Sequence, residues 1–468
     1  MAIQRYSASA DTTITNAYQE NLVTRGTGSN MGYADALEVF SIYGQESGSN
    51  GQSQELSRIL IQFDTTKMTA DRAAGRLGAS GSVSFFLKLH NARTPYTLPQ
   101  DFTLVTAPLK KPWSEGTGLD LANYKDLGTS NWMKGNATSS WVRVGGDVRT
   151  NNVYNTRFPE GYENMEVNIT NLVEKWINAA STNYGMLIRL TGSQEAYFSS
   201  SLGGLGTGQS GSVLQNTQGV KSSYYTKMFF ARSSEFFFKR PCIEARWDDR
   251  VSDDRENFFY SSSLAPAADN LNTLYFYTDR DWETNVTASY VSRGIYKCQV
   301  ALTAAATPLQ LVYDVWHSGS GLEYFTGSIY PEKMPTYDAA PTFNRVTSCT
   351  NLKKKYSRQD TARFRFFVRD KNWSPTVYVV STTNNPTEII PSASYNIRRV
   401  TDNYNAIPYG TGSNYSTYLS YDKDGNYFDF DMSLLESGYM YEINLSYYND
   451  SIGDWQEQPQ TFKFRVEE

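Results

Sequence analysis

The chain of 468 residues has few of the side chains on which most enzymatic and metal chemistry depends. It contains two histidines, His90 and His317, and three cysteines, Cys242, Cys298 and Cys349. A Ser-His-Asp or Cys-His nucleophilic site would have to use one of these histidines, and the sequence around each indicates a surface position. No HExxH, CxxC or histidine-rich cluster occurs, so neither a zinc site nor a cofactor is expected. The odd number and wide spacing of the cysteines favour reduced thiols and a protein made in a cytoplasm.

Basic clusters and long apolar runs are also missing. Charged residues make up 19% of the chain, the formal net charge is −5, and Lys353–Lys355 is an isolated basic run. Binding to nucleic acid normally needs a clustered positive surface, so a nucleic-acid partner is not expected. No run of 18 or more apolar residues occurs, which predicts no membrane span, and the first residues lack the apolar core of a signal peptide.

Aromatic and turn-forming residues are abundant. The chain has 34 Tyr, 24 Phe and 33 Gly, together with many Ser, Thr and Asn. This mixture is typical of short strands joined by tight turns, so an all-β fold is expected. The length suits about three domains. We place a jelly-roll-like sandwich with one short helix at residues 1–248, and two immunoglobulin-like sandwiches at 249–350 and 351–468.

The one helix is predicted within residues 168–180. Leu172, Val173, Trp176, Ile177 and Ala180 form a single apolar stripe at helical spacing. A threonine at position 170 is placed to cap its N-terminus. An Asn-Tyr-Gly turn follows and leads into an apolar strand at 186–190. A lone amphipathic helix of this kind is expected to close one end of a sandwich.

Six segments in a fixed order extend this pattern over residues 1–248. They are Asn30–Val39, Ser57–Asp64, Lys111–Gly116, Asn168–Leu190, Tyr197–Ser201 and Arg240–Trp247. Together they resemble the DNRLRE family of β-sandwich domains, which is related to the carbohydrate-binding modules found beside polysaccharide-degrading enzymes. The chain departs from the family at Ser199–Ser201, where a Ser-Arg-Glu triplet is typical, and in a Gly/Ser/Thr-rich insertion at 202–223.

Trp113 and Glu115 lie in the Trp-Ser-Glu-Gly segment of this series, and Trp132 and Trp141 follow it. An indole can stack on a pyranose ring, so these four residues are the candidates for a carbohydrate site or an interface. In the resembled family the motif is architectural, and core packing is the competing interpretation for each tryptophan. A glycosidase would also need two carboxylates at a fixed separation, and no such pair is identified. No catalytic residue is therefore assigned.

A weak metal candidate lies near the C-terminus. Asp422, Asp424 and Asn426 are spaced by two, as oxygen ligands of Ca²⁺ can be. Asp424-Gly425 between two tyrosines is equally a hairpin signal. The glycine is displaced from its position in an EF-hand loop and no closing glutamate follows, so the turn is favoured over the metal.

The later two domains show period-two alternation. Leu309, Leu311, Tyr313 and Val315 share one face of a predicted strand at 309–316. Alternating Phe/Val and charged residues predict half-buried antiparallel strands at 363–369 and 462–467. Strands spaced by turns over roughly a hundred residues are typical of immunoglobulin-like sandwiches.

Residues 350–468 also resemble a group of viral proteins. The resemblance rests on three segments, YNIRRVTDNYNAIPYGTGS, YLSYDKDGNYFDFDMSLLESGYMYEINLSYYN and EQPQTFKFRVEE. They are similar to the C-terminal ends of virion structural proteins from T4-like tailed phages of marine cyanobacteria. The resemblance implies a structural component of the particle, assembled in the host cytoplasm.

The expected function is therefore that of a non-enzymatic virion protein of the neck, tail, baseplate or head decoration. Its partners would be other virion proteins and further copies of itself in a symmetric homo-oligomer. The alternative is a carbohydrate-binding or receptor-binding fibre protein that recognises a host glycan. A secreted polysaccharide-degrading enzyme is a third hypothesis, disfavoured by the missing signal peptide and acid pair.

Overall fold

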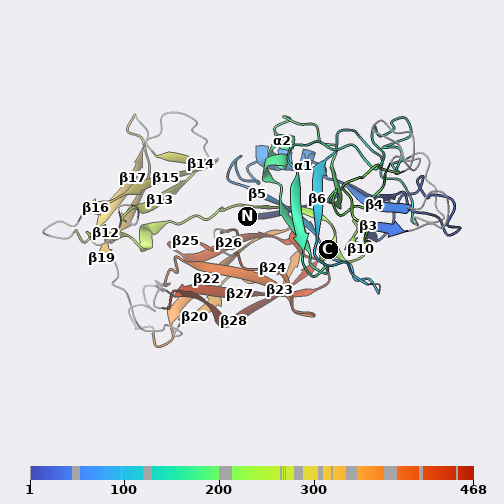
Figure 1. Cartoon of the computed structure of the whole chain (residues 1–468). Coiled ribbons are helices and arrows are strands. Elements are labelled where there is room, and N and C mark those ends of the chain that lie inside the picture. Colours follow the sequence, from blue (N-terminus) through green and yellow to red (C-terminus); the bar gives the residue numbers. More distant parts are fainter. Residues whose placement is uncertain are drawn as a thin grey trace. The chain divides into compact units, whose positions relative to one another are not determined.

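A computed structural model shows an all-β chain, as the composition predicts, with two short α-helices among its described residues (Figure 1). Contacts divide the chain into two compact units, Gln4–Arg246 and Trp247–Glu468 with Met1–Ile3. The structure describes residues 2–44, 53–95, 97–119, 129–199, 213–263, 266, 268, 270–278, 288–292, 294–303, 309–317, 320–333, 345–373, 387–410, 415–449 and 452–468. The first part of the Gly/Ser/Thr-rich insertion, residues 202–212, lies outside these ranges.

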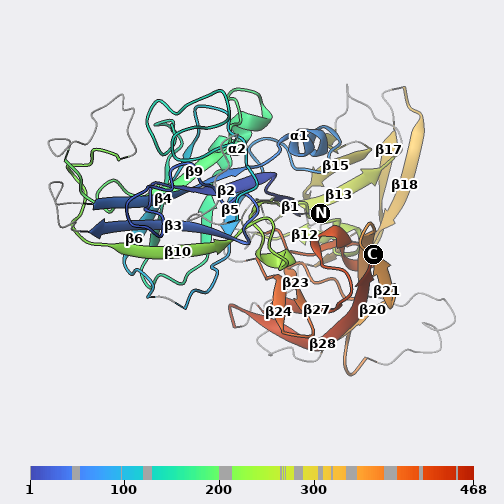
Figure 2. The same cartoon turned by 90° about the vertical axis from the view of Figure 1, so that its right-hand side faces the viewer.

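The unit Gln4–Arg246 is built on two sheets (Figure 2). The smaller has the order β1 (Ile3–Ser7), β11 (Cys242–Arg246), β5 (Ser84–Leu89) and β8 (Met165–Asn168). The larger has the order β10 (Tyr224–Phe230), β3 (Ala36–Gly44), β4 (Ser53–Gln62), β9 (Met186–Leu190), β6 (Phe102–Pro108) and β7 (Tyr154–Phe158), and β2 (Ala10–Thr15) also pairs with β4. Strand β5 alternates between buried and half-buried residues, as a strand with one face on the core does.

The predicted helix is present as α2 (Thr170–Ile177). Four residues of its stripe are buried, whereas Ala180 lies beyond its end and is exposed. The predicted cap is wrong: the N-cap is Ile169, and Thr170 Oγ1 instead accepts the backbone N–H of Phe85 at 2.9 Å. Thr170 therefore ties the helix to strand β5 rather than capping it.

A second helix, α1 (Thr66–Ala73), corrects the expectation of one. Only Met68 and Asp71 are buried on it, so it has no apolar stripe by which the sequence could reveal it. Arg72 of α1 donates two hydrogen bonds of 2.7 Å to the carboxylate of Glu174 on α2. This ion pair joins the two helices, which are far apart in the sequence.

The strands of residues 259–333 form three small sheets. Their core is small: Phe258, Leu274 and Ile329 are buried together, with Leu302, Val312 and Trp316 packed against them. The sheets have the orders β16 (Leu302–Thr303), β12 (Phe259–Ser261), β19 (Glu332–Lys333); β13 (Asn272–Tyr277), β15 (Ile295–Val300), β14 (Ser289–Ser292); and β17 (Val312–His317), β18 (Glu323–Ile329).

The strands of residues 345–467 form a sandwich of two sheets, drawn in orange and red in Figure 1. Across the sandwich, Phe364 packs on Phe464 with centroids 5.5 Å apart, and Tyr395 stacks on Phe428 at 3.8 Å. The sheets have the orders β20 (Arg345–Cys349), β22 (Thr361–Asp370), β26 (Gly425–Asp431), β25 (Ser420–Asp422); and β21 (Lys355–Ser357), β28 (Asp454–Glu467), β27 (Met440–Asn449), β23 (Ala393–Arg399), β24 (Tyr404–Ile407).

Candidate interaction surface

The three candidate tryptophans lie inside the protein. Trp113 is 9%, Trp132 0% and Trp141 5% exposed, and they belong to one apolar cluster with Ile14, Leu60 and others. Trp113 Nε1 donates to the carbonyl of Tyr184 at 2.9 Å and Trp141 Nε1 to that of Asn131 at 3.0 Å. These indoles offer no open ring face on which a sugar could stack. The structure brings the three tryptophans together, but as part of the apolar core and not as an exposed platform.

Glu115 anchors the same region. Its carboxylate accepts two hydrogen bonds from the Arg232 guanidinium, at 2.5 and 2.6 Å, and the backbone N–H of Asp11 at 2.8 Å. Three segments far apart in the sequence therefore meet at one side chain. This geometry agrees with the architectural interpretation of the Trp-Ser-Glu-Gly motif.

Asp11 is the most perturbed carboxylate beside this anchor. Its side chain is fully buried; Oδ2 accepts the backbone N–H of Arg232 at 2.7 Å, and Oδ1 has no hydrogen-bond partner among the described residues. Burial, with the nearby Glu115 carboxylate, raises the pKa of Asp11 to about 7, against the opposing effect of Arg232. Sequence patterning could not find this group, because Asp11 lies in an ordinary polar strand.

The candidate calcium ligands are engaged elsewhere. Asp422 accepts two hydrogen bonds from Arg365, at 2.5 and 2.8 Å, and Asn426 binds both backbone groups of Ile390 through its amide. Asp424 lies in the turn between β25 and β26, where Asp422 pairs with Gly425. Within the described ranges, no group of three or more His, Cys, Asp or Glu could hold a metal. The hairpin interpretation fits this geometry.

The two histidines and the three cysteines lie in different surroundings. His90 is half-buried rather than fully on the surface, and burial, with Lys88 and Arg5 nearby, lowers its pKa to about 4. His317 is exposed, as predicted. All three cysteines are free, also as predicted, and burial raises the pKa of the Cys242 thiol to about 11. At neutral pH the His90 imidazole is therefore neutral and the Cys242 thiol is protonated.

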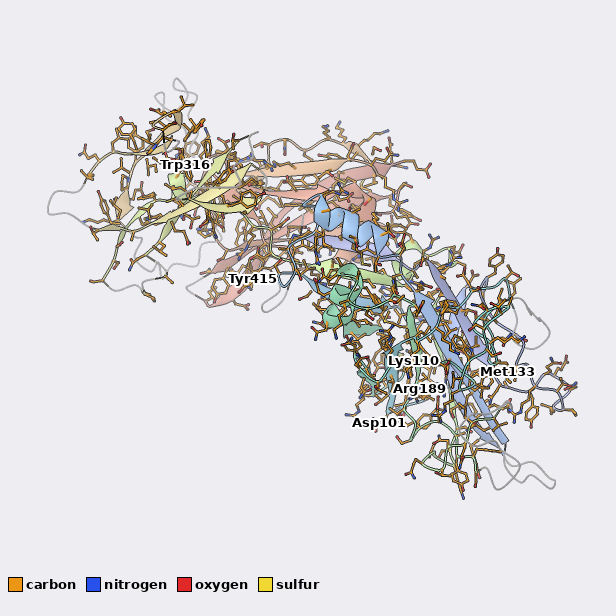
Figure 3. The ribbon with its side chains drawn as sticks, turned by 90° about the horizontal axis from the view of Figure 1, so that it is seen from above. Asp101, Lys110, Met133, Arg189, Trp316 and Tyr415 are labelled. Atoms are coloured by element: carbon orange, nitrogen blue, oxygen red, sulfur yellow. The ribbon has the colours of Figure 1, made fainter. Side chains whose placement is uncertain are left out.

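Four apolar residues on and just before β17 are exposed rather than buried in a core. Leu309, Leu311, Tyr313 and Val315 are 51%, 36%, 62% and 50% exposed. The predicted strand at 309–316 is present as Val312–His317, so Tyr313 and Val315 share one side of it, whereas Leu309 and Leu311 lie before its start. The core lies on the other side of the strand, where Trp316 stacks on Phe276 with centroids 5.3 Å apart (Figure 3).

A charged cluster supports β17 from its core side. Asp314 is 9% exposed and accepts two hydrogen bonds from Arg255, which also pairs with Asp253 and lies 5.3 Å from the ring of Phe325 on β18. Trp316 Nε1 adds a further hydrogen bond to Asp314 at 2.9 Å. The inward face of β17 and β18 is therefore fixed, and their outward face is presented to solvent.

A row of aromatic rings lies on the last sandwich. Tyr415 and Tyr418 have centroids 5.0 Å apart, Tyr418 and Trp455 5.1 Å, and Trp455 and Tyr448 5.5 Å. Tyr415, labelled in Figure 3, is 40% exposed and carries the Arg250 guanidinium 4.6 Å from its ring centre. The other rings are half-buried. No pattern in the sequence predicts this row, because residues 415–418 and 448–455 are brought together only by the fold.

Comparison with known proteins identifies no family. No family model and no curated protein matches the chain. Solved structures that match include a point mutant of Salmonella alpha-2-macroglobulin, at 9% identity and a TM-score of 0.16 over 99% of this chain and 28% of that one. The native form of E. coli alpha-2-macroglobulin matches at 9% identity and a TM-score of 0.16, over 100% of this chain and 26% of that one. The chain thus spans little more than a quarter of those proteins, and similarity this low carries no argument. No helix of the described residues is long and apolar enough to cross a membrane.

Proposed function

We propose that this chain is a non-enzymatic structural protein of a tailed-phage virion, which acts by binding neighbouring proteins in the particle. The observation that carries the proposal is the solvent-facing side of the β17–β18 sheet, where Tyr313 and Val315 of β17 are exposed together with the flanking residues Leu309, Leu311 and Tyr330. An apolar surface with aromatic residues and without exposed charge is typical of the core of a protein–protein interface.

The distribution of exposed apolar side chains supports the same conclusion. Among the described residues, 24 large apolar side chains are exposed, and 11 of them lie between residues 271 and 330. That segment is a small fraction of the chain and has a small core. Its surface is therefore enriched in the residues that interfaces bury. Residues 350–468 resemble virion proteins of cyanobacterial phages, so the assembly that we propose is a phage particle. The candidate locations in the particle are the neck, the tail, the baseplate and the head decoration.

The test is to purify the phage particle whose genome encodes this chain and to trace the sequence into a cryo-EM map. The expected result is a symmetric layer in which the exposed residues of β17 and β18 are covered by a neighbouring subunit. Absence of the chain from purified particles, measured by mass spectrometry of intact virions, would refute the proposal.

A second candidate function, recognition of a host glycan, is favoured by the row of Tyr415, Tyr418, Trp455 and Tyr448. Aromatic rings beside hydrogen-bonding groups suit a sugar, whose C–H face packs on a ring while its hydroxyls bind polar atoms. Calorimetric titration with host surface polysaccharide would show binding that is lost in Trp455→Ala and kept in Trp373→Ala, a half-buried indole elsewhere in the same sandwich. Equal titrations for both variants, or none for the wild type, would eliminate this candidate.

A further inference from the structure

We propose that the outer face of the β17–β18 sheet pairs with the same face of a second copy of this chain. The inference rests on the assembly function proposed above and names one of its partners. The face consists of the exposed residues Leu309, Leu311, Tyr313, Val315, Thr326, Ser328 and Tyr330, and is called the outer face below.

The register of the two strands places four of these residues on one side. Tyr313 pairs with Ser328 and Val315 with Thr326, and directly paired residues of antiparallel strands project to the same face. Leu311 immediately precedes β17, and Tyr330, which is 66% exposed, immediately follows β18. The result is a strip with apolar residues along β17 and at its ends, and two small hydroxyl residues along β18.

The absence of charge on this strip favours a second copy over an oppositely charged partner. In a twofold interface each residue near the axis faces its own equivalent, so a charge there would meet a like charge. None of the residues of the outer face is ionisable at neutral pH. The acidic Asp314 of β17 points to the other side, where Arg255 binds it. Glu323 and His317, which pair with each other where β18 begins and β17 ends, lie at the end of the strip.

The size of the strip also suits pairing of two copies. The exposed parts of its five large side chains amount to roughly 500–600 Å² for typical residue areas. Two copies would together bury roughly 1,000–1,200 Å², which reaches the minimum of about 1,000 Å² for a specific interface.

The support beneath the strip reduces the ordering cost of pairing. Trp316 and Phe276 stack on the inner side, and Arg255 joins Asp314 to the ring of Phe325. A sheet that is already held against its own core loses little conformational freedom when a second sheet covers it.

The experiment is sedimentation equilibrium of the full chain at low to high micromolar concentration. We expect the wild type to dimerise, and the double variant Tyr313→Lys with Val315→Lys to dissociate at least ~100-fold more readily, because it places like charges opposite one another across the twofold axis. The matched control is Tyr225→Lys with Val23→Lys, whose side chains are 53% and 80% exposed in the other unit. Circular dichroism of each variant must match the wild type.

A cross-link tests the symmetry. Ser328→Cys should give a covalent dimer with a short bismaleimide, since Ser328 would face its own equivalent across sheets about 10 Å apart. Ser289→Cys, an exposed position on β14, is the control and should remain monomeric. The pairing would be overturned if the wild type were monomeric at every concentration, or if the double lysine variant dimerised as well as the wild type. Equal cross-linking of Ser328→Cys and Ser289→Cys would also overturn it.

The same reagents separate this inference from the proposed function. A chain that is present in purified particles but monomeric in solution, with the lysine variant still incorporated, would overturn the pairing and leave the virion role intact. A chain that dimerises through the outer face but is absent from particles would refute the virion role and leave the pairing intact.

Discussion

Replacing Asp11 with asparagine should stabilise the protein, and by an amount that depends on pH. Asp11 is fully buried, with one carboxylate oxygen unpaired among the described residues and the Glu115 carboxylate nearby. The amide of the substituted side chain would keep an oxygen to accept the Arg232 N–H and would never carry the charge. The substitution Asp11→Asn therefore removes the cost of a buried, partly satisfied anion.

The magnitude follows from the pKa of Asp11, which burial raises from 3.8 to about 7. Between these two values the folded state binds more protons than the unfolded state, so stability falls as the pH rises through this window. A rise in pKa of this size lowers the free energy of unfolding by about 4 kcal/mol in total, from a pH well below both values to a pH well above them. Of that amount, about 2.5 kcal/mol should be lost between about pH 5 and about pH 8, in the wild type only.

Denaturant unfolding followed by tryptophan fluorescence measures this directly. Three indoles, Trp113, Trp132 and Trp141, lie in one cluster with Ile14 on β2, the strand that carries Asp11. The stability gained by Asp11→Asn should grow by about 2.5 kcal/mol from about pH 5 to about pH 8. Asp101→Asn, whose carboxylate is 68% exposed, should show no such growth. A gain that stays constant within ~0.5 kcal/mol, or that shrinks as the pH rises, would refute the reasoning.

Three further predictions concern single side chains. Trp132→Ala, at a fully buried indole, should cost about 3–5 kcal/mol of unfolding free energy, and a loss below ~1 kcal/mol would contradict its place in the core. Lys227→Met should cost about 2–4 kcal/mol, because the ammonium donates to Asn91 Oδ1 and to two backbone carbonyls that methionine would leave unpaired; an unchanged denaturation midpoint would contradict this. Calcium should not shift the melting temperature, since Arg365 occupies the Asp422 carboxylate, and a rise that Asp422→Asn abolishes would restore the metal hypothesis.

Sequence patterns predict the elements better than they predict which way these elements face. The stripe of α2 and the strand Met186–Leu190 stand where the sequence places them, because each has a strong pattern. Helix α1 escapes prediction because its surface is polar and its attachment is an ion pair. The alternation along Leu309–Val315 correctly indicates that Tyr313 and Val315 share one side of a strand, although that strand begins only at Val312. It could not show that this side faces solvent, since burial depends on what packs against the sheet.

The candidate sites show the same limit. A tryptophan in the core and one in a sugar platform look alike in sequence, so Trp113, Trp132 and Trp141 could be resolved only by their burial. Asp11 and the row from Tyr415 to Trp455 carry no local signal at all, because their environments are made by segments distant in the chain. Pairwise spacing reports neighbours in sequence, whereas these sites are made of neighbours in space.

The strand order of the smaller N-terminal sheet has a consequence for synthesis. Strand β1 lies at its edge and pairs with β11, the last strand of that unit. The residues of β1 can therefore pair in this sheet only after residues 242–246 have been synthesised. Closure between such distant segments is slow, because the entropy of a long loop is lost before the contact forms. A ribosome would therefore release nearly the whole unit before this sheet could close, and nascent chains that stop short of β11 would expose the edge of β5 to aggregation and to chaperones.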